Sequence, residues 1–416
     1  MELTPISSIN SRQQNPSDWF VKELAELCDI DAGLSKPKII FGKGFLVVTV
    51  QDLYEGEKIE SSSLKRVVLT DKEAQRYRLF DGDILIGNAS VKKSGIGYSN
   101  RFLGFGETVI FAKYAYRVNN FRLISSEYLH YVLRLDQTRQ WIISNSQTGT
   151  LTNLNKAAAK SIPIPFPKSI EEQQSITTAL SDVDSLLDSL DRLIAKKRNL
   201  KQAAMQQLLT GQTRLPGFSG EWLRTELKHL VSTPITDGPH LTPTFYETGV
   251  PFLSVNNLTN NRIDLTDLRF ISRADDEIFS RKCKPRKGDV LLGKAASVGK
   301  VAIVEDDLDF NIWSPIALVR SGETLDTKFL YFQLLSADSI NQVTLLTNSS
   351  SQGNIGMGDI EKIQISYPCV DEQIAISKVL TSMDMEISAI ESRRNKTAAL
   401  KQGMMQELLT GRTRLV

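Results

Sequence analysis

The chain contains two copies of one long segment, and this duplication limits its possible folds more than any other feature. Residues 171–215 and 371–415 both contain Glu-Gln near their start and Leu-Leu-Thr-Gly near their end, at a constant register difference of 200 positions. The preceding segments match more loosely, for example Asp81–Gly87 with Lys287–Gly293, at offsets between 201 and 206. Such drift is expected when loops differ in length while the scaffold stays the same. The sequence therefore predicts a globular part and a long helix, followed by a second globular part and a second long helix.

The predicted fold class is mixed α/β, with two repeated domains. A length of 416 residues exceeds the roughly 250–300 at which single hydrophobic cores stop growing. Strands are predicted at 45–50, 83–86 and 316–319, and short helices at 128–133 and 329–334. We predict a first globular domain at 1–168, a first long helix at 169–211, a second globular domain at 212–368 and a second long helix at 369–416.

Each long helix carries an apolar seam at alternating intervals of three and four residues, which is typical of a coiled coil. Ser169 is the predicted N-cap of the first helix, and Gly211 and Gly411 are predicted stops. A helix of roughly 60 Å with so narrow a strip cannot bury it alone, so we predict that the two helices pack as an antiparallel coiled coil. The alternative is that each helix lies on its own globular part. The seam residues are Ile176, Leu180, Val183, Leu187, Leu190, Ile194, Ile376, Leu380, Met383, Ile387 and Ile390.

Basic residues interrupt both seams, at Lys196–Arg198 and at Arg393 and Arg394, and apolar residues resume at Leu200 and Leu400. Two interpretations remain open. The later apolar residues either belong to an ordinary solvated helix end or form a second surface for a partner protein.

Composition excludes several classes of protein. The 50 Lys+Arg nearly balance the 48 Asp+Glu, so a nucleic-acid surface must be a local patch. The three cysteines form no CxxC pair, which argues against a disulfide framework and favours a reducing compartment. Met1–Pro5 shows no basic region followed by an apolar run, and no stretch is long enough to span a bilayer, so we expect a cytoplasmic protein.

No motif in the sequence indicates a catalytic, metal or cofactor site. The three histidines, His130, His229 and His240, belong to no HExxH pattern. Gly293–Val301 superficially resembles a phosphate-binding loop, but it has one residue too many between its glycines and Val301 where a Ser or Thr is required. We therefore expect no catalytic residue, no metal and no cofactor in this chain.

The repeated Glu372-Gln373, Leu400-Lys401-Gln402 and Leu408–Gly411, with the turn Thr236-Asp237-Gly238-Pro239-His240, give the chain its family likeness. It resembles the specificity (S) subunit of type I restriction-modification systems. The resemblance covers nearly the whole chain, although the first half has Asp29–Gly33 where the second has its Asp-Gly-Pro-His turn. It implies a non-catalytic subunit whose two domains read an asymmetric, bipartite target in double-stranded DNA. It also implies two modification (methyltransferase) subunits that carry S-adenosylmethionine, and restriction (translocase/nuclease) subunits, as partners.

Base reading requires side chains that can form two hydrogen bonds with one base edge, such as Arg or Lys with guanine and Asn or Gln with adenine. His240 is the leading individual candidate because Gly238 and Pro239 place it on a tight turn. The basic stretches Lys92-Lys93 and 281–287 suit phosphate contacts. For each candidate the alternative is a solvated surface residue. The candidates are Gln51, Asn88, Lys92, Lys93 and Arg101 in the first half and His240, Thr242, Asn256, Asn257, Lys294 and Ser297 in the second.

Three functions remain in competition on the sequence alone. The first is the non-catalytic DNA-recognition subunit. The second is an enzyme of unfamiliar motif, which would turn over without any partner. The third is a coiled-coil adaptor with two protein-binding heads, which would show no sequence-dependent DNA binding.

Overall fold

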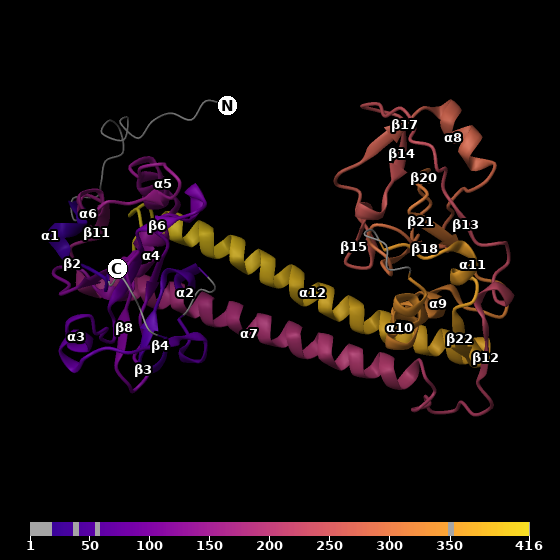
Figure 1. Ribbon diagram of the computed structural model, residues 1–416, viewed down its shortest axis with the longest axis horizontal. Coiled ribbons are helices and arrows are strands. Elements are labelled where there is room, and N and C mark those ends of the chain that lie inside the picture. The colour runs from indigo at the N-terminus through magenta and orange to yellow at the C-terminus, as the bar shows by residue number, and fades with distance from the viewer. Residues whose placement is uncertain (1–18, 36–40, 55–58, 348–352, 416) are drawn as a thin grey trace. The chain divides into compact units, whose positions relative to one another are not determined.

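A computed structural model describes residues 19–35, 41–54, 59–347 and 353–415 (Figure 1). Met1–Pro5, on which the expectation about a leader depends, lie outside this part. The described chain mixes helices with short strands, and it divides into two compact units. Unit 1 comprises 1–190 and 393–416, and unit 2 comprises 191–392. The predicted mixed α/β class with two repeated domains is confirmed.

Unit 1 contains a four-stranded sheet, a three-stranded sheet and smaller strand pairs. The four-stranded sheet has the order β2-β9-β5-β7, and the three-stranded sheet has the order β4-β3-β8. The strands are β1 (Trp19–Glu23), β2 (Asp29–Ala32), β3 (Phe41–Val48), β4 (Lys65–Val67), β5 (Ile84–Gly87), β6 (Ala89–Ser90), β7 (Ser99–Arg101), β8 (Val109–Phe111), β9 (Ala115–Asn119), β10 (Thr152–Asn153) and β11 (Pro163–Pro167). The short helices are α1 (Leu24–Leu27), α2 (Val50–Tyr54), α3 (Asp71–Arg76), α4 (Ser126–Arg134), α5 (Asp136–Ser144) and α6 (Lys156–Lys160).

Unit 2 repeats this plan. Its four-stranded sheet has the order β13-β21-β18-β19, and its three-stranded sheet has the order β17-β14-β20. The strands are β12 (Leu223–Glu226), β13 (Thr236–Asp237), β14 (Val250–Leu253), β15 (Leu258–Thr259), β16 (Arg262–Ile263), β17 (Arg269–Ile271), β18 (Val290–Gly293), β19 (Val301–Ile303), β20 (Asn311–Ile312), β21 (Ile316–Val319) and β22 (Gln364–Tyr367). The short helices are α8 (Arg273–Ser280), α9 (Thr327–Leu334), α10 (Ala337–Leu346) and α11 (Met357–Ile360).

Strand registers make the two sheets equivalent residue by residue. On β5, Ile84 pairs with Val118 and Gly87 with Ala115, while on β18 Val290 pairs with Val319 and Gly293 with Ile316. These strands are short and fully buried, and they consist mostly of Ile, Leu and Val, as expected for a central strand. The loose match that the sequence showed at 81–87 and 287–293 is therefore a match of core strands.

The two long helices are α7 (Ile170–Leu208) and α12 (Val370–Leu408), and each is divided between the units. Unit 1 holds the start of α7 and the end of α12, and unit 2 holds the start of α12 and the end of α7. Ser169 caps α7, because its hydroxyl accepts from the Glu172 amide at 3.1 Å. The predicted stops Gly211 and Gly411 both have φ of 72°, which suits glycine at a helix end. The four predicted domain boundaries do not follow these units and stay a prediction.

Within each unit the two helix segments run antiparallel, and repeated ion pairs fix their register. In unit 1, Arg414 binds Glu172 at 2.5 Å and Lys401 binds Asp184 at 2.5 Å. The same pairs recur in unit 2, because Arg214 binds Glu372 at 2.5 Å and Lys201 binds Asp384 at 2.6 Å. The glutamate side chains are almost fully buried, so the arginine supplies the charge and the hydrogen bonds that a buried carboxylate requires.

The Glu-Gln start of each copy is explained by a second polar contact. The Gln173 side chain accepts from the Ser125 amide at 2.9 Å and donates to the Leu123 and Pro167 carbonyls. Gln373 makes the same bonds to Asp326, Thr324 and Pro368. Each glutamine thus fixes the start of a long helix to the loop before a short helix of its own globular part.

The predicted seam residues differ in how deeply they are buried and in what they pack against. Ile176 and Leu180 are fully buried in the main core of unit 1, which Leu408 and Leu409 from the end of α12 also enter. Their counterparts occupy the core of unit 2 with Leu208 and Leu209. The first seam positions of each helix therefore pack on its own globular part, as the alternative interpretation predicted. The end of the opposite long helix packs in the same core. Of the other seam positions, Leu190, Ile194 and Ile387 are buried and Val183, Leu187, Met383 and Ile390 are half-buried.

Candidate nucleic-acid interface

The ends of the equivalent strands β5 and β18 carry different residues in the two units. Asn88 follows Gly87 and Lys294 follows Gly293, and the amide of each donates to a carbonyl at 2.8 Å. On the neighbouring strand, Ala32 pairs with Tyr116 and Asp237 pairs with Ala317, which are themselves equivalent. The scaffold is thus the same, but unit 1 has Ala and Asn where unit 2 has Asp and Lys.

The glycine of each turn lets two backbones approach closely. A Cβ on Gly33 would lie 2.1 Å from the Ala112 oxygen, and one on Gly238 would lie 1.9 Å from the Ile312 oxygen. Only glycine fits at such distances. The equivalent turn of unit 1 therefore has the same glycine, Gly33, but it has Ala32 where unit 2 has Asp237.

Asp237 is the centre of a charged cluster in unit 2. Its side chain is 5% exposed, and its oxygens lie 2.5 Å from Lys282 Nζ, 3.1 Å from Lys294 Nζ and 3.2 Å from His240 Nε2. Burial alone would raise the pKa of Asp237, but hydrogen bonds from Lys282 and Lys294 outweigh burial and lower it. The carboxylate is therefore charged at neutral pH and holds three basic side chains together.

Unit 1 has a neutral arrangement at the same place. Asn88 is half-buried and hydrogen-bonds the Tyr116 side chain, whose hydroxyl donates to the Leu154 carbonyl at 3.1 Å. The basic residues lie farther along the loop, where Lys92 and Lys93 are both exposed. The strand end of unit 1 thus offers amides and hydroxyls, with its positive charge confined to the loop tip.

A capped turn after the parallel strand fixes a second pair of equivalent positions. Asp52 accepts from the Thr49 amide at 2.7 Å, and Asn257 accepts from the Ser254 amide at 2.9 Å. The Asn257 amide nitrogen also donates to the Asp264 and Asp267 carbonyls. Asn257 is therefore buried and fully engaged in this turn, which argues against its predicted role in base reading. The preceding residues, Gln51 and Asn256, are both exposed.

Two further predicted residues are engaged inside the protein. Arg101 lies at the end of β7 away from Asn88, where it binds the Ser126 hydroxyl at 3.0 Å and forms an ion pair with Glu127. Lys294 is 8% exposed and bound to Asp237, so its ammonium is not presented at the surface. Neither is available for direct base reading in this conformation. Of the remaining candidates, Thr242 is exposed and Ser297 is half-buried.

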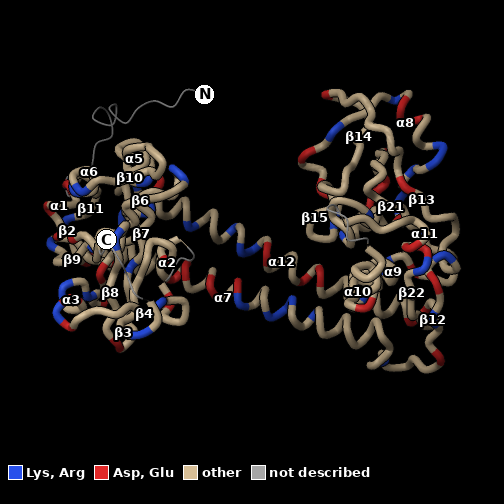
Figure 2. Tube along the Cα trace, in the orientation of Figure 1, with Lys and Arg blue, Asp and Glu red and all other residues tan. Residues whose placement is uncertain are grey.

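The basic stretch 281–287 does not act as one patch. Lys282 turns toward Asp237, whereas Lys284 pairs with Asp276 at 2.9 Å and with Asp309 at 2.7 Å. Figure 2 shows the same intermixture along the chain, with Lys and Arg next to Asp and Glu in both units. Positive charge available to a polyanion is therefore local, as the near-zero net charge predicted.

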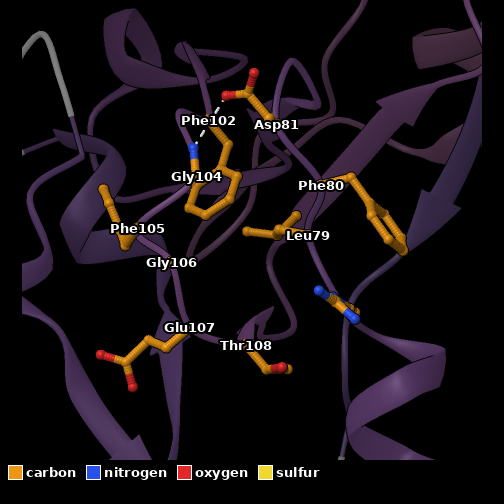
Figure 3. A pocket seen from close by; sticks show the side chains of 10 residues that line it. Leu79, Phe80, Asp81, Phe102, Gly104, Phe105, Gly106, Glu107 and Thr108 are labelled. Atoms are coloured by element: carbon orange, nitrogen blue, oxygen red, sulfur yellow. Dashed lines mark hydrogen bonds between the residues drawn. The ribbon is translucent and has the colours of Figure 1, made fainter.

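One open pocket of unit 1 lies beside the turn that precedes β5 (Figure 3). Leu79 and Phe102 point toward each other, and Asp81 accepts a hydrogen bond from the Gly104 amide at 3.0 Å. Glu107 turns outward and pairs with Arg66 at 3.0 Å. The carboxylates of this pocket are thus held by local contacts, and it provides less for a ligand than the strand ends do.

Asp237 is the residue that the sequence analysis missed. The turn Thr236–His240 was recognised, but only its histidine was selected as a candidate. Its position next to Gly238 in a family-like turn could have identified Asp237 from the sequence. Its partners Lys282 and Lys294 come from distant parts of the sequence, so the cluster itself could not be predicted.

Residues 16–197 and 233–400 match the family model of the type I restriction modification DNA specificity domain. The chain belongs to this family. As a type I DNA specificity subunit it is the recognition component and not a catalytic one, as predicted. It is 30% identical to the type I restriction enzyme MjaIX specificity subunit of Methanocaldococcus jannaschii, covering 85% of this chain and 84% of that one. It is 23% identical to the EcoKI specificity subunit of Escherichia coli K12, covering 81% of this chain and 75% of that one.

Two solved structures share the fold of this specificity subunit. The S subunit of a type I restriction-modification system from M. genitalium superposes with a TM-score of 0.57 at 16% identity, covering 95% of this chain and 98% of the other. A chain from a study of complex assembly and conformational transition in a type I R-M system gives a TM-score of 0.60 at 17% identity, covering 96% and 99%.

The described residues lack both a membrane-spanning helix and a metal-binding cluster. None of their helices is both long enough and apolar enough to cross a membrane. The same residues contain no group of three or more His, Cys, Asp or Glu side chains arranged to hold a metal ion.

Proposed function

We propose that this specificity subunit reads an asymmetric, bipartite DNA target, with one half-site for each unit. The observation that carries the proposal is the pair of equivalent strand ends. One scaffold occurs twice, with Ala32 and Asn88 at the strand ends of unit 1 and the buried ion pair of Asp237 and Lys294 at those of unit 2. In unit 2 this pair also holds the exposed His240, so the side chains around the two strand ends differ. Two readers with the same backbone and different side chains recognise two different half-sites, because base readout depends on the donors and acceptors that are presented.

The residues that we assign to DNA contacts are those that the fold leaves accessible near these strand ends. In unit 1 they are Gln51, Asn88, Lys92 and Lys93, and in unit 2 they are His240, Thr242, Asn256 and Ser297. Gln51 and Asn256 occupy equivalent positions and both carry a carboxamide, which pairs with adenine N6 and N7. The exposed lysines suit phosphates, which position the protein without specifying sequence.

We further propose that the chain positions methyltransferase subunits, and restriction subunits with them, on this target. S-adenosylmethionine then belongs to the methyltransferase partner. Exposed apolar side chains on the long helices support a protein partner, since Leu200 is 47% exposed in unit 2 and Leu400 is 60% exposed in unit 1. This favours the partner surface over the solvated helix end. The adaptor with two protein-binding heads remains the alternative.

A domain exchange tests the recognition function. Residues 221–365 are replaced by the matching segment of another specificity subunit, and methylated adenines are mapped genome-wide in cells that contain the modification subunits. One half of the methylated sequence should change and the other half should stay. A change in both halves, or in neither, contradicts the two-reader proposal, and methylation by the purified chain alone would show an enzyme instead.

A further inference from the structure

The cluster around Asp237 in unit 2 has more positive than negative charge, and we infer that it binds a backbone phosphate of DNA. In this inference Lys282 and His240 contact the phosphate, and Asp237 is the positioning residue that holds them. The inference rests on the proposed function, because it adds a phosphate site to the half-site of unit 2.

The charge balance supports an anionic ligand. One carboxylate, Asp237, faces two ammonium groups, Lys282 and Lys294, so the cluster keeps a net charge of about +1 even with a neutral imidazole. Lys294 is nearly buried, and its ammonium binds Asp237 directly. Asp237 thus shares one negative charge between two ammonium groups, and one positive charge of the cluster stays uncompensated.

The arrangement of the cluster presents its positive groups outward. The side chain of Asp237 is 5% exposed, whereas those of Lys282 and His240 are 52% and 70% exposed. An anion that approaches the surface therefore meets the ammonium and the imidazole before the carboxylate. An ammonium has three N–H donors. Lys282 uses one on Asp237 at 2.5 Å and directs a second toward the Gly238 carbonyl at 3.4 Å.

The backbone beneath the cluster is rigid. Gly238 lies against the Ile312 carbonyl, and the Pro239 carbonyl accepts from the Ser314 amide at 3.2 Å. Lys282 lies two residues after the end of α8, and its amide donates to the Phe279 carbonyl at 3.0 Å. Two separate segments thus bring their cations to one carboxylate, so the side chains lose less freedom when a phosphate binds.

Lys284 provides a matched contrast two residues away. It pairs with Asp276 and Asp309, and Arg273 pairs with Asp309 as well, so this second group of charges is neutral. Two lysines of one loop thus differ in their surroundings, and only Lys282 belongs to a cluster with excess positive charge. This distinction makes the inference testable with single substitutions.

The test measures DNA binding of the full-length chain, coexpressed with its modification subunits, as a function of salt concentration. For Lys282→Gln, the slope of log K against log salt should fall in magnitude by about 0.9, which weakens binding about fivefold at roughly 0.15 M salt. For Lys284→Gln, the slope should equal that of the wild type. Equal slopes for the wild type and Lys282→Gln would overturn the phosphate site.

A double variant tests the positioning role of Asp237. Asp237→Ala with Lys294→Asn introduces the residues that unit 1 has at the same positions, so the scaffold accommodates them and the net charge is unchanged. The salt slope should stay as in the wild type, while affinity falls about two- to tenfold because Lys282 and His240 are no longer held. Unchanged affinity would overturn the positioning role.

The same titrations separate this inference from the proposed function. If the wild-type complex binds all sequences equally but Lys282→Gln still reduces the slope, sequence recognition is wrong and the phosphate site stands. If the wild type discriminates between sequences and Lys282→Gln has no effect on the slope, the phosphate site is wrong and recognition stands.

Discussion

The two units have the same strand pairing around β5 and β18 but carry different side chains at the ends of these strands. At the ends of β5 and β18 the strands pair in the same register, yet unit 1 has the neutral Ala32 and Asn88 and unit 2 has the ion pair of Asp237 and Lys294. The polar contacts that fix the long helices, such as Gln173 and Gln373, are by contrast the same in both. The difference shows that the duplicated chain keeps its scaffold and varies the chemistry at the strand ends.

The largest expected effect concerns the leucines that close each core. Leu409→Ala and Leu209→Ala each remove a fully buried side chain and should cost about 2–5 kcal/mol of stability. Leu409 lies in the core of unit 1 and Leu209 in that of unit 2. Hydrogen exchange should therefore increase in β1 and β11 for Leu409→Ala, and in β12 and β22 for Leu209→Ala. The opposite assignment would contradict the division into units.

The next effect concerns the charged pair itself. Asp237→Ala alone leaves the buried ammonium of Lys294 without its carboxylate and should cost about 3 kcal/mol, whereas adding Lys294→Asn should recover most of this loss. Urea unfolding of the two variants measures the difference. Urea unfolding of the reverse double variant, Ala32→Asp with Asn88→Lys, makes the same stability comparison in unit 1. If the single and double variants of unit 2 are equally stable, the pair is not coupled.

A third comparison uses acid. Burial, together with the nearby positive charges of Arg134 and Lys401, lowers the pKa of His130 to about 3. In the unfolded chain the pKa of a histidine is near 6.5, so between about pH 6.5 and pH 3 His130 takes up a proton in the unfolded state but not in the folded state. The free energy of unfolding therefore falls as the pH falls, by about 2 kcal/mol at pH 5. Unit 2 has Tyr331 at the equivalent position, and burial raises its pKa. His130→Tyr should therefore remove this acid sensitivity, which unfolding at pH 7 and pH 5 measures.

The smallest expected effect is on the exposed helix faces. Leu200→Gln and Leu400→Gln should change the stability of the isolated chain by less than about 0.5 kcal/mol, because both side chains are already largely in water. Copurification with the modification subunits should nevertheless weaken for either variant. Undiminished copurification in both would favour the solvated helix end.

The sequence predicted the repeated architecture well, because its evidence was periodic and local. The strand at 316–319, the helix around Tyr128 and the Ser169 cap all follow from short patterns. The packing of the long helices was predicted only in part. A seam specifies which residues are buried but not their partners, and the contact of Leu409 with the first core joins residues nearly 400 positions apart.

The site was harder to predict for the same reason. Side-chain type identified Arg101, Asn257 and Lys294 as base readers, but an ion pair, a capped turn and a buried carboxylate engage them inside the fold. The partners of Arg101 and Lys294 come from distant segments, so no local pattern reveals them, whereas the turn from Ser254 to Asn257 is local and could have been recognised. Gln51, Lys92 and His240, for which exposure is enough, remain candidates.

The division of each long helix between the two units also sets an order for folding during synthesis. Unit 2 spans 191–392, so all of its residues have been made before the second part of unit 1 begins at Arg393. Unit 1 needs Leu409 and Arg414 to fill its core and to neutralise Glu172, and these residues are made only after all of unit 2. The half that is translated first should therefore complete its fold last, and until then its open core depends on chaperones or on rapid elongation to escape aggregation.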